Sequence, residues 1–377
     1  MSTHFGWLIA GAVLPSFVVC WAAAWLVRWF GPRLGLVDRP GERKVHTRPM
    51  PTAGGLAIWL GVVLPLAAGY LLLFAAYGSG GDATAGEWLP LPDWVRLHVP
   101  GLMHQGSKLL ALLAGGTVLM LLGLADDRFG VPWPVRLGVQ IAVALVMVQF
   151  GWTVTLVHDM PPLNAAIAVV WIVGLVNSLN MLDNMDGLSA GVAAIASAML
   201  AAVMLLYPDP MTNQPQLFVG GFLLVLAGAL LGFLCHNFRP ARLFMGDAGS
   251  YLVGYLLAMA TLSATFGGEG VPGHAVLAPL CVLAVPIYDT TTVVLIRLRQ
   301  GRSPFVGDKS HFSHRLVELG MSPTRAVLTI YLATATCGLG ALLLHQVDAT
   351  GACIILLLVG CTLVLVGILE TAARRAS

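Results

Sequence analysis

The sequence carries very little charge. Only 10% of its 377 residues are Asp, Glu, Lys or Arg, whereas 58% are hydrophobic and the mean hydropathy is +0.84. This balance excludes an ordinary soluble domain. The formal net charge of +2 is too small to indicate a nucleic-acid partner. We therefore expect a membrane protein that binds no nucleic acid.

Cysteine is also scarce and forms no pattern. The six cysteines are scattered through apolar runs without any Cys-x-x-Cys spacing. We interpret them as packing thiols and expect neither a disulfide nor a metal site from them. Residues 1–7 contain no Lys or Arg ahead of the first apolar stretch. This argues against a cleaved signal peptide, so the first helix should be retained.

Long segments without a charged residue approach or exceed the roughly 18 residues that suggest a spanning helix. The sequence therefore predicts an all-α polytopic membrane protein with about ten or eleven transmembrane helices. We expect residues 1–377 to form a single integral membrane catalytic domain. The spans are placed near residues 7–30, 53–77, 107–125, 134–151, 163–180, 188–207, 215–235, 248–266, 274–297, 323–345 and 350–370.

Lys and Arg are unevenly divided between the two sides of this topology. One side holds only Arg96 and Lys108, and the other 18 of the 20 fall on the opposite side. The positive-inside rule makes that opposite side cytoplasmic and places the N-terminus outside. The cytoplasmic loops are expected near 31–52, 126–133, 181–187, 236–247 and 298–322, and residues 78–106 form an extracytoplasmic loop.

The few acidic residues cluster where helices should end. Asp126 and Asp127 lie at the end of the third predicted helix, where the helix dipole disfavours carboxylates. Helix-end charges that simply reach water are the alternative. We favour function, because two adjacent carboxylates at a helix C-terminus cost free energy.

A second group repeats every three residues at the end of the fifth predicted helix: Asn177, Asn180, Asp183 and Asp186. This spacing keeps successive side chains near one helix edge with a gradual rotation. An ordinary polar loop does not account for amides inside the apolar helix. Asp247 lies before another helix, where an N-cap is the simple alternative. Together these oxygen donors suit a hard divalent cation.

Two basic loops lie on the same side. Lys44 belongs to the first, and the second holds His311 and His314 at a spacing that could face one ligand if helical. Anchoring by the positive-inside rule explains part of both loops. The histidines are not needed for anchoring and suit a pyrophosphate, whereas zinc lacks a companion ligand motif.

In these stretches the chain resembles the polyprenyl-phosphate N-acetylhexosamine-1-phosphate transferases, and most closely the branch that uses UDP-N-acetylglucosamine. The resemblance rests on five stretches in order: residues 43–55, the pair Asp126 and Asp127, residues 177–187, residues 244–250 and residues 303–314. It implies a bundle like that of the muramoyl-pentapeptide transferases, in a bacterial inner membrane, with the active site facing the cytoplasm. It also implies transfer of a sugar-1-phosphate from a UDP-N-acetylhexosamine to a polyprenyl phosphate lipid, with release of UMP.

The resemblance assigns roles to the residues already singled out. Asp247 becomes a ligand of Mg²⁺ with Asn180 as a second, and Mn²⁺ could replace the magnesium. The implied catalytic residues are Asp126, Asp127 and Asp247. The nucleotide and diphosphate are assigned to Asn177, Asp183, Asp186, Phe244, His311 and His314. The lipid phosphate is assigned to Arg136 and Lys44.

Two positions depart from the family pattern. The histidine loop reads His-Phe-Ser-His at 311–314 where the family commonly has His-x-His-His, so Ser313 replaces one of the family's histidines. Arg136 stands where the family commonly has a lysine, and a guanidinium holds a phosphate in a different geometry.

Three alternatives stay open at this point. One is the muramoyl-pentapeptide branch of the same family, and another is a multi-spanning transporter, which would need ionisable groups along a mid-membrane path. For the chemistry we favour direct displacement by the lipid phosphate over a covalent aspartyl intermediate. A homodimer is a further partner that the sequence leaves undecided.

Overall fold

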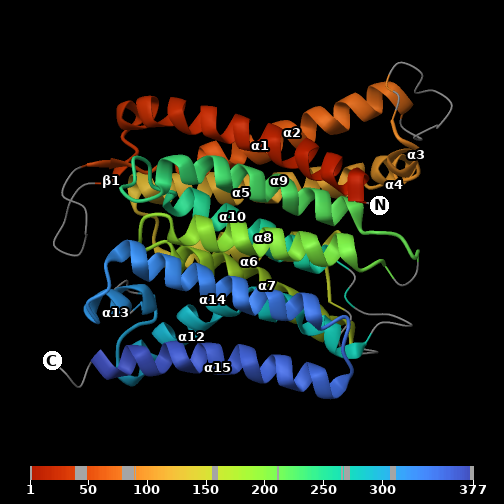
Figure 1. Cartoon of the computed structure of the whole chain (residues 1–377). Helices are drawn as coiled ribbons and strands as arrows, with labels where there is room; N and C mark the ends of the chain where they lie inside the picture. Colours follow the sequence, from red (N-terminus) through yellow and green to blue (C-terminus); the bar gives the residue numbers. More distant parts are fainter. Residues whose placement is uncertain are drawn as a thin grey trace.

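The computed structural model describes residues 2–38, 49–78, 89, 91–154, 160–209, 212–264, 266, 272–305 and 311–373. Long helices run side by side along one axis (Figure 1). The first helix starts at one end of the bundle, and the last helix finishes at the other. The long helices are α1 (Ser2–Phe30), α2 (Gly54–Tyr77), α5 (Gly106–Phe129), α6 (Trp133–Gln149), α7 (Pro161–Leu182), α8 (Leu188–Leu206), α9 (Leu217–Asn237), α10 (Gly246–Ser263), α12 (Ala284–Arg299), α14 (Pro323–Leu343) and α15 (Ala349–Ala373).

Short elements connect or extend these helices. They are η1 (Gly31–Leu34), β1 (Val37–Asp38), β2 (Met50–Pro51), α3 (Asp93–Arg96), α4 (Val99–His104), η2 (Gly273–Leu277), α11 (Ala278–Val282) and α13 (Phe312–Glu318). The two strands pair antiparallel. They tie the ends of the first basic loop together, while Lys44 itself lies outside the described residues.

The expected all-α polytopic membrane fold is confirmed, and each of the eleven predicted spans corresponds to a helix. Within the described part of the chain, eight helices are long and apolar enough to cross a membrane. A ninth span arises if η2 and α11 are taken with α12, from which they are bent by 68°. The remaining two are α6, with only 17 residues, and α10, whose first turn is polar. Length and composition thus support fewer spans than the ten or eleven expected.

Helix α10 forms the centre of the bundle. Every residue from Ala248 to Thr261 is buried, and the helix packs against α2, α5 and α7. The approach of α5 is very close, because a Cβ on Gly123 would lie 2.3 Å from the Cα of Ala248. Small residues allow such contacts between membrane helices, whose association relies on packing. As a result, the first turn of α10 is held directly against the last turns of α5.

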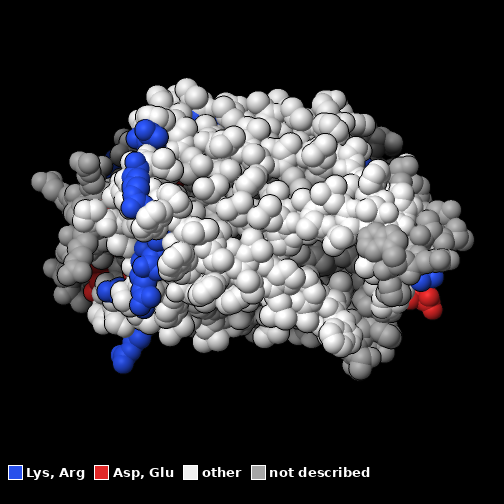
Figure 2. All heavy atoms as spheres, turned by 90° about the horizontal axis from the view of Figure 1, so that it is seen from above, with Lys and Arg blue, Asp and Glu red and all other residues white. Residues whose placement is uncertain are grey.

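Charge is concentrated at one end of the molecule. On the face shown in Figure 2, Lys and Arg gather in a band near the end that carries β1 in Figure 1. Between the band and the opposite end, this face is a broad and almost uncharged surface, as expected for helices that face lipid. Several helices contribute arginines to their last turns, among them Arg28, Arg128, Arg297 and Arg299.

Candidate active site

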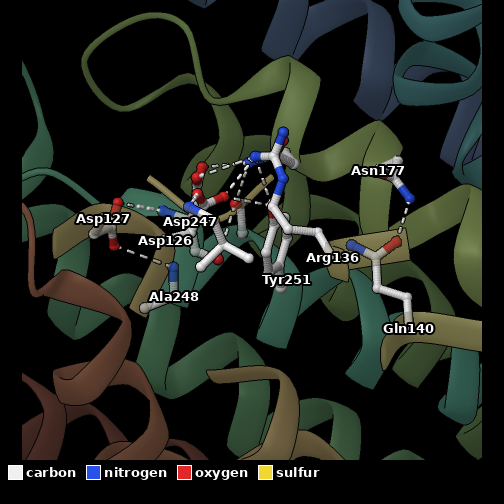
Figure 3. A network of polar contacts seen from close by, with 11 residues as sticks. Asp126, Asp127, Arg136, Gln140, Asn177, Asp247, Ala248 and Tyr251 are labelled. Atoms are coloured by element: carbon white, nitrogen blue, oxygen red, sulfur yellow. Dashed lines mark hydrogen bonds and ion pairs between the residues drawn. The ribbon is translucent and has the colours of Figure 1, made fainter. Parts of the chain in front are cut away.

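Four helix ends meet at this charged end of the bundle. Helices α5 and α7 finish there, and α6 and α10 begin there, so acidic residues far apart in the sequence come together (Figure 3). Asp126 and Asp127 come from α5, Arg136 from α6, and Asp247 from α10. The structure thus unites most residues of the predicted acidic motifs in one polar network.

Asp127 caps helix α10 from a neighbouring helix. Its Oδ1 accepts a hydrogen bond from the backbone N–H of Asp247 at 3.0 Å, and its Oδ2 accepts one from Ala248 at 3.3 Å. The first N–H groups of a helix lack intrahelical partners, and the helix dipole favours a negative charge there. The N-terminus of α10 therefore offsets the unfavourable position of Asp127 at the end of its own helix.

Glycine is required where this cap forms. Gly246 has φ +70°, and a Cβ there would lie 2.4 Å from the carbonyl oxygen of Thr52 and 2.5 Å from Oδ2 of Asp127. A side chain would therefore clash with the carboxylate that caps the helix. Asp247, the next residue, lies inside the first turn of α10, so the simple alternative of an N-cap role for it does not hold.

Asp126 is held by three donors. Its Oδ2 accepts hydrogen bonds from Nη1 of Arg136 at 2.5 Å and from the Tyr251 hydroxyl at 3.1 Å, and its Oδ1 accepts one from the Val131 N–H at 2.8 Å. Arg136 also donates to the Tyr251 hydroxyl at 3.2 Å. Asp126 is buried, whereas the Arg136 side chain is 27% exposed. Asp126 therefore orients a guanidinium whose other N–H groups can reach a ligand.

The two residues predicted to share a metal ion lie together. Nδ2 of Asn180 donates to Oδ1 of Asp247 at 2.6 Å and to the Ser250 hydroxyl at 3.0 Å. Oδ2 of Asp247 lies 3.8 Å from Nη1 of Arg136, and the side chain of Asp247 is 32% exposed. Asp247 is thus the acid of this network that combines exposure with a neighbouring amide.

The donor chemistry at this point fits magnesium better than a metal that needs a closed cage. Among the described residues, no three His, Cys, Asp or Glu side chains are arranged to hold a metal ion. Magnesium is commonly held by one or two carboxylates together with water and substrate phosphates. Asp247 matches that pattern. The amide N–H₂ of Asn180 donates to Asp247 here, so Asn180 would add its oxygen only after its amide turns over, and the other ligands would come from substrate and water.

The loop between α7 and α8 adds two more carboxylates. Burial raises the pKa of Asp183 to about 8, and the charges of Asp247 and Asp186 act in the same direction, against a hydrogen bond from the Gly246 N–H. Oδ2 of Asp186 accepts a hydrogen bond from the Ala241 N–H at 3.1 Å. This bond fastens the α7–α8 loop to the segment that leads into α10.

Asn177 faces a different neighbour. Its Nδ2 donates to Oε1 of Gln140 at 2.6 Å and to the Val173 carbonyl at 2.8 Å. Figure 3 shows this pair apart from the Asp247 cluster, on the far side of Arg136. Three residues along a helix rotate a side chain by about 60°, so Asn177 meets α6 while Asn180 meets α10.

The histidine loop packs beside the α7–α8 loop. Ser313 donates its hydroxyl hydrogen to Oδ1 of Asn184 at 2.5 Å. His311 directly precedes α13 and His314 lies in its first turn, with the ring centroids 6.5 Å apart. His311 also contacts Asp289, a buried acid of α12, with 2.9 Å between Nδ1 and Oδ2. The two predicted histidines therefore lie close together, as a shared ligand would need.

Phe244 is fixed through its backbone. Its N–H donates to the Pro51 carbonyl at 2.8 Å, and its carbonyl accepts from the Gly54 N–H at 3.0 Å. The Phe244 side chain is partly exposed. The segment before α10 is thereby joined to β2 and to the start of α2.

Some residues of the network escaped the sequence analysis: Gln140, Asn184, Tyr251, Asp289 and Ser313. Tyr251 and Gln140 look like ordinary members of apolar helices, and nothing in their spacing marks them. Asp289 could have been found, because it is an acid inside the span predicted near residues 274–297.

Residues 109–265 match the family model described as Glycosyl transferase family 4. A probable undecaprenyl-phosphate N-acetylglucosaminyl 1-phosphate transferase of Bacillus subtilis (strain 168) is 30% identical, covering 85% of this chain and 80% of that protein. A decaprenyl-phosphate N-acetylglucosaminephosphotransferase of Mycobacterium tuberculosis is 32% identical over 87% of this chain and 80% of that protein. An undecaprenyl-phosphate alpha-N-acetylglucosaminyl 1-phosphate transferase of Pasteurella multocida is 31% identical, covering 86% and 84%.

Proposed function

The chain belongs to glycosyl transferase family 4, and we propose that it moves N-acetylglucosamine-1-phosphate from UDP-N-acetylglucosamine to a polyprenyl phosphate, releasing UMP. The observation that carries the proposal is the network at one end of the bundle, where Asp247 and Asn180 lie beside a partly exposed arginine. A cation site next to a guanidinium can receive two phosphate-bearing substrates at once.

The names of the three relatives favour this donor over a muramoyl-pentapeptide donor, because all three specify N-acetylglucosamine. A transporter would need its ionisable groups along a path through the bundle. The acidic network lies instead where helices end. The position of the network supports a transferase over a transporter. The names of the relatives support N-acetylglucosamine as the transferred sugar.

We place the reaction on the cytoplasmic side of a bacterial inner membrane. The band of Lys and Arg lies at the same end of the bundle as the acidic network, which supports this orientation. The donor would then enter from the compartment that holds UDP-sugars. The lipid phosphate would approach from the membrane surface at the same level.

In the proposed site, Asp247 and Asn180 hold Mg²⁺, or Mn²⁺ in its place. When bound, the ion lowers the repulsion between the two polyanionic substrates and stabilises the charge of the departing UMP. Arg136 receives the lipid phosphate together with Lys44. Phe244, Asp183, Asp186 and Asn177 are assigned to the nucleoside side, and His311 with His314 to the diphosphate.

In this scheme an oxygen of the lipid phosphate attacks the β-phosphorus of the donor. The bond to the oxygen bridging the two phosphates breaks, and that oxygen leaves with UMP. Because a phosphate monoester has a second pKa near 6, its dianion is abundant at neutral pH and needs no strong base. Both oxygens of Asp126 and of Asp127 accept hydrogen bonds, so an aspartyl nucleophile would first have to lose them. Direct displacement is therefore favoured.

The proposal is tested by purified protein supplied with undecaprenyl phosphate and one donor at a time. UDP-N-acetylglucosamine should release UMP, and the reaction without lipid should not. UDP-N-acetylmuramoyl-pentapeptide and UDP-N-acetylgalactosamine serve as comparison donors. Faster release from the muramoyl donor would assign the chain to the other branch. Release from none of them would contradict the proposed function.

A further inference from the structure

Asp289 is an acid for which the proposed reaction gives no role. It lies in the middle of α12, between Tyr288 and three threonines, in a helix that forms part of the bent span, and it is 1% exposed. A buried charge in a membrane bundle is costly unless it is paired and hydrogen-bonded. Its position therefore calls for a specific partner.

Both oxygens of Asp289 reach the start of α13. Oδ1 accepts a hydrogen bond from the Phe312 N–H at 3.0 Å, and Oδ2 lies 2.9 Å from Nδ1 of His311. The first bond holds the backbone at the histidine, and the second holds its ring. One side chain thus fixes both where His311 stands and how it is turned.

The second contact also determines a tautomer. An ionised carboxylate can only accept, so Nδ1 of His311 carries the hydrogen. In the neutral ring Nε2 is then an acceptor, and in the charged ring it is a second donor. Carboxylates that orient histidines in this way act through the ring nitrogen that they leave available.

Two further contacts hold the same region. Nη1 of Arg297 donates to the Pro304 carbonyl at 2.7 Å, and the Ser313 hydroxyl donates to Asn184 at 2.5 Å. The first fastens the segment after α12, and the second fastens α13 to the loop that carries Asp183 and Asp186. The start of α13, with His311 directly before it, is therefore held from α12 through Asp289 and from the α7–α8 loop through Ser313.

We propose that Asp289 is a positioning residue that keeps His311 in the Nδ1–H tautomer and presents Nε2 to the diphosphate of the UDP-sugar. This inference rests on the proposed function for its substrate. Its structural core, the tautomer set by a buried acid, is independent of the substrate. Asp289 touches neither substrate and acts through His311.

The informative variant is Asp289→Asn, which keeps the size of the side chain. Its oxygen can still accept from the Phe312 N–H, but its amide N–H₂ would face Nδ1 of His311. That ring nitrogen must then become an acceptor, so the hydrogen moves to Nε2. Loss of a carboxylate that orients a metal-bound histidine typically costs about 10- to 100-fold, and by analogy we expect kcat/KM for the UDP-sugar to fall by about that factor. The KM for polyprenyl phosphate should stay unchanged.

A double-mutant cycle separates this role from a merely structural one. In a His311→Ala background, Asp289→Asn should change the rate by less than about twofold, because the residue through which it acts is gone. The matched control is Thr292→Val on the same helix, whose hydroxyl donates within α12 to the carbonyls of Tyr288 and Asp289. This variant should keep the wild-type rate. Independent, additive losses from Asp289→Asn and His311→Ala would overturn the inference.

Nitrogen-15 NMR of histidine-labelled protein tests the tautomer without any assay of activity. The His311 signals are identified by their loss in His311→Gln, since the chain has ten histidines. Wild-type protein should show hydrogen on Nδ1, and Asp289→Asn should show it on Nε2 alone. Hydrogen on Nε2 alone in the wild type would overturn the inference. A wild-type protein that is inactive with every donor would instead refute the proposed function. The NMR result would then still decide whether Asp289 sets the tautomer of His311.

Discussion

Asp127→Asn should loosen the first turn of α10. The carboxylate accepts two backbone hydrogen bonds there, at 3.0 and 3.3 Å, and it supplies a negative charge at the helix N-terminus. An asparagine keeps one acceptor and turns an N–H₂ group toward the other backbone donor. The variant therefore loses one bond, gains a repulsive contact and removes the charge.

The size of the effect follows from these losses. A hydrogen bond to a charged group contributes about 1.5–3 kcal/mol, and a charge at a helix end about 0.3–1 kcal/mol. With part of the first retained, we expect a local loss of about 2 kcal/mol. Since 1.4 kcal/mol is a factor of ten, the local opening equilibrium should rise about 30-fold.

Hydrogen exchange measured by mass spectrometry reports this local opening equilibrium directly. Peptides that contain the amides of Asp247 and Ala248 should exchange about 30-fold faster in Asp127→Asn, while peptides from α14 should be unchanged. The rate of transfer should also fall, because Asp247 is displaced. Asp126→Asn is the matched comparison, because it releases Arg136 and leaves the α10 cap in place. It should impair transfer mainly through the KM for the lipid phosphate.

Unchanged exchange in Asp127→Asn together with a lost rate would show that Asp127 acts in the chemistry instead of holding α10. Wild-type rates in both variants would remove the pair from the mechanism. Equal effects of the two substitutions on exchange at α10 would contradict the inference that Asp127 caps α10 while Asp126 holds Arg136.

Four further outcomes are expected. Asp247→Ala should abolish transfer in a folded, membrane-inserted protein, and excess chelator should abolish it in the wild type, with recovery on adding Mg²⁺; normal turnover in chelator would refute the metal assignment. In metal-free protein, stability should fall as the pH rises from about 4 to 8, because the raised pKa of Asp183 favours its protonated form in the folded state; thermal melts of Asp183→Asn should lack this component. His311→Ala and His314→Ala should raise the KM for the UDP-sugar more than that for the lipid, and an equal rise in steady-state assays would argue against the diphosphate assignment. A cysteine placed at the exposed Ser303 should react with an impermeant reagent only in inside-out vesicles, and labelling of intact cells would reverse the proposed orientation.

The helices could be predicted from the sequence because each is an apolar run of nearly the length that a membrane requires. Whether α6 and α10 cross the membrane could not be predicted in this way. Helix α10 owes its place to packing, since Gly123 and Gly246 permit contacts that no hydropathy pattern records. The bend at Leu283 falls between Pro279 and Pro286, and proline explains a break without fixing its 68° angle.

The acids of the site could be found because charges beside apolar helices are costly and therefore stand out. Their partners were harder to predict. Tyr251 and Gln140 meet Asp126 and Asn177 only through the packing of separate helices. The three-residue spacing suggested one polar edge, yet Asn177 and Asn180 bond to different helices because each step of three rotates the side chain. Asp127 was singled out by its costly position at a helix end, whereas its cap on α10 depends on an approach of the two helices that the sequence does not record.

The fate of the β-phosphorus tests the central claim most directly. UDP-N-acetylglucosamine labelled with ³²P in the β-phosphate and ³H in the uridine is incubated with purified protein and undecaprenyl phosphate. The account predicts that ³²P enters the lipid fraction while ³H is released as UMP, one for one. Release of ³H as UDP with no ³²P in the lipid would show transfer of the sugar alone and would contradict the account.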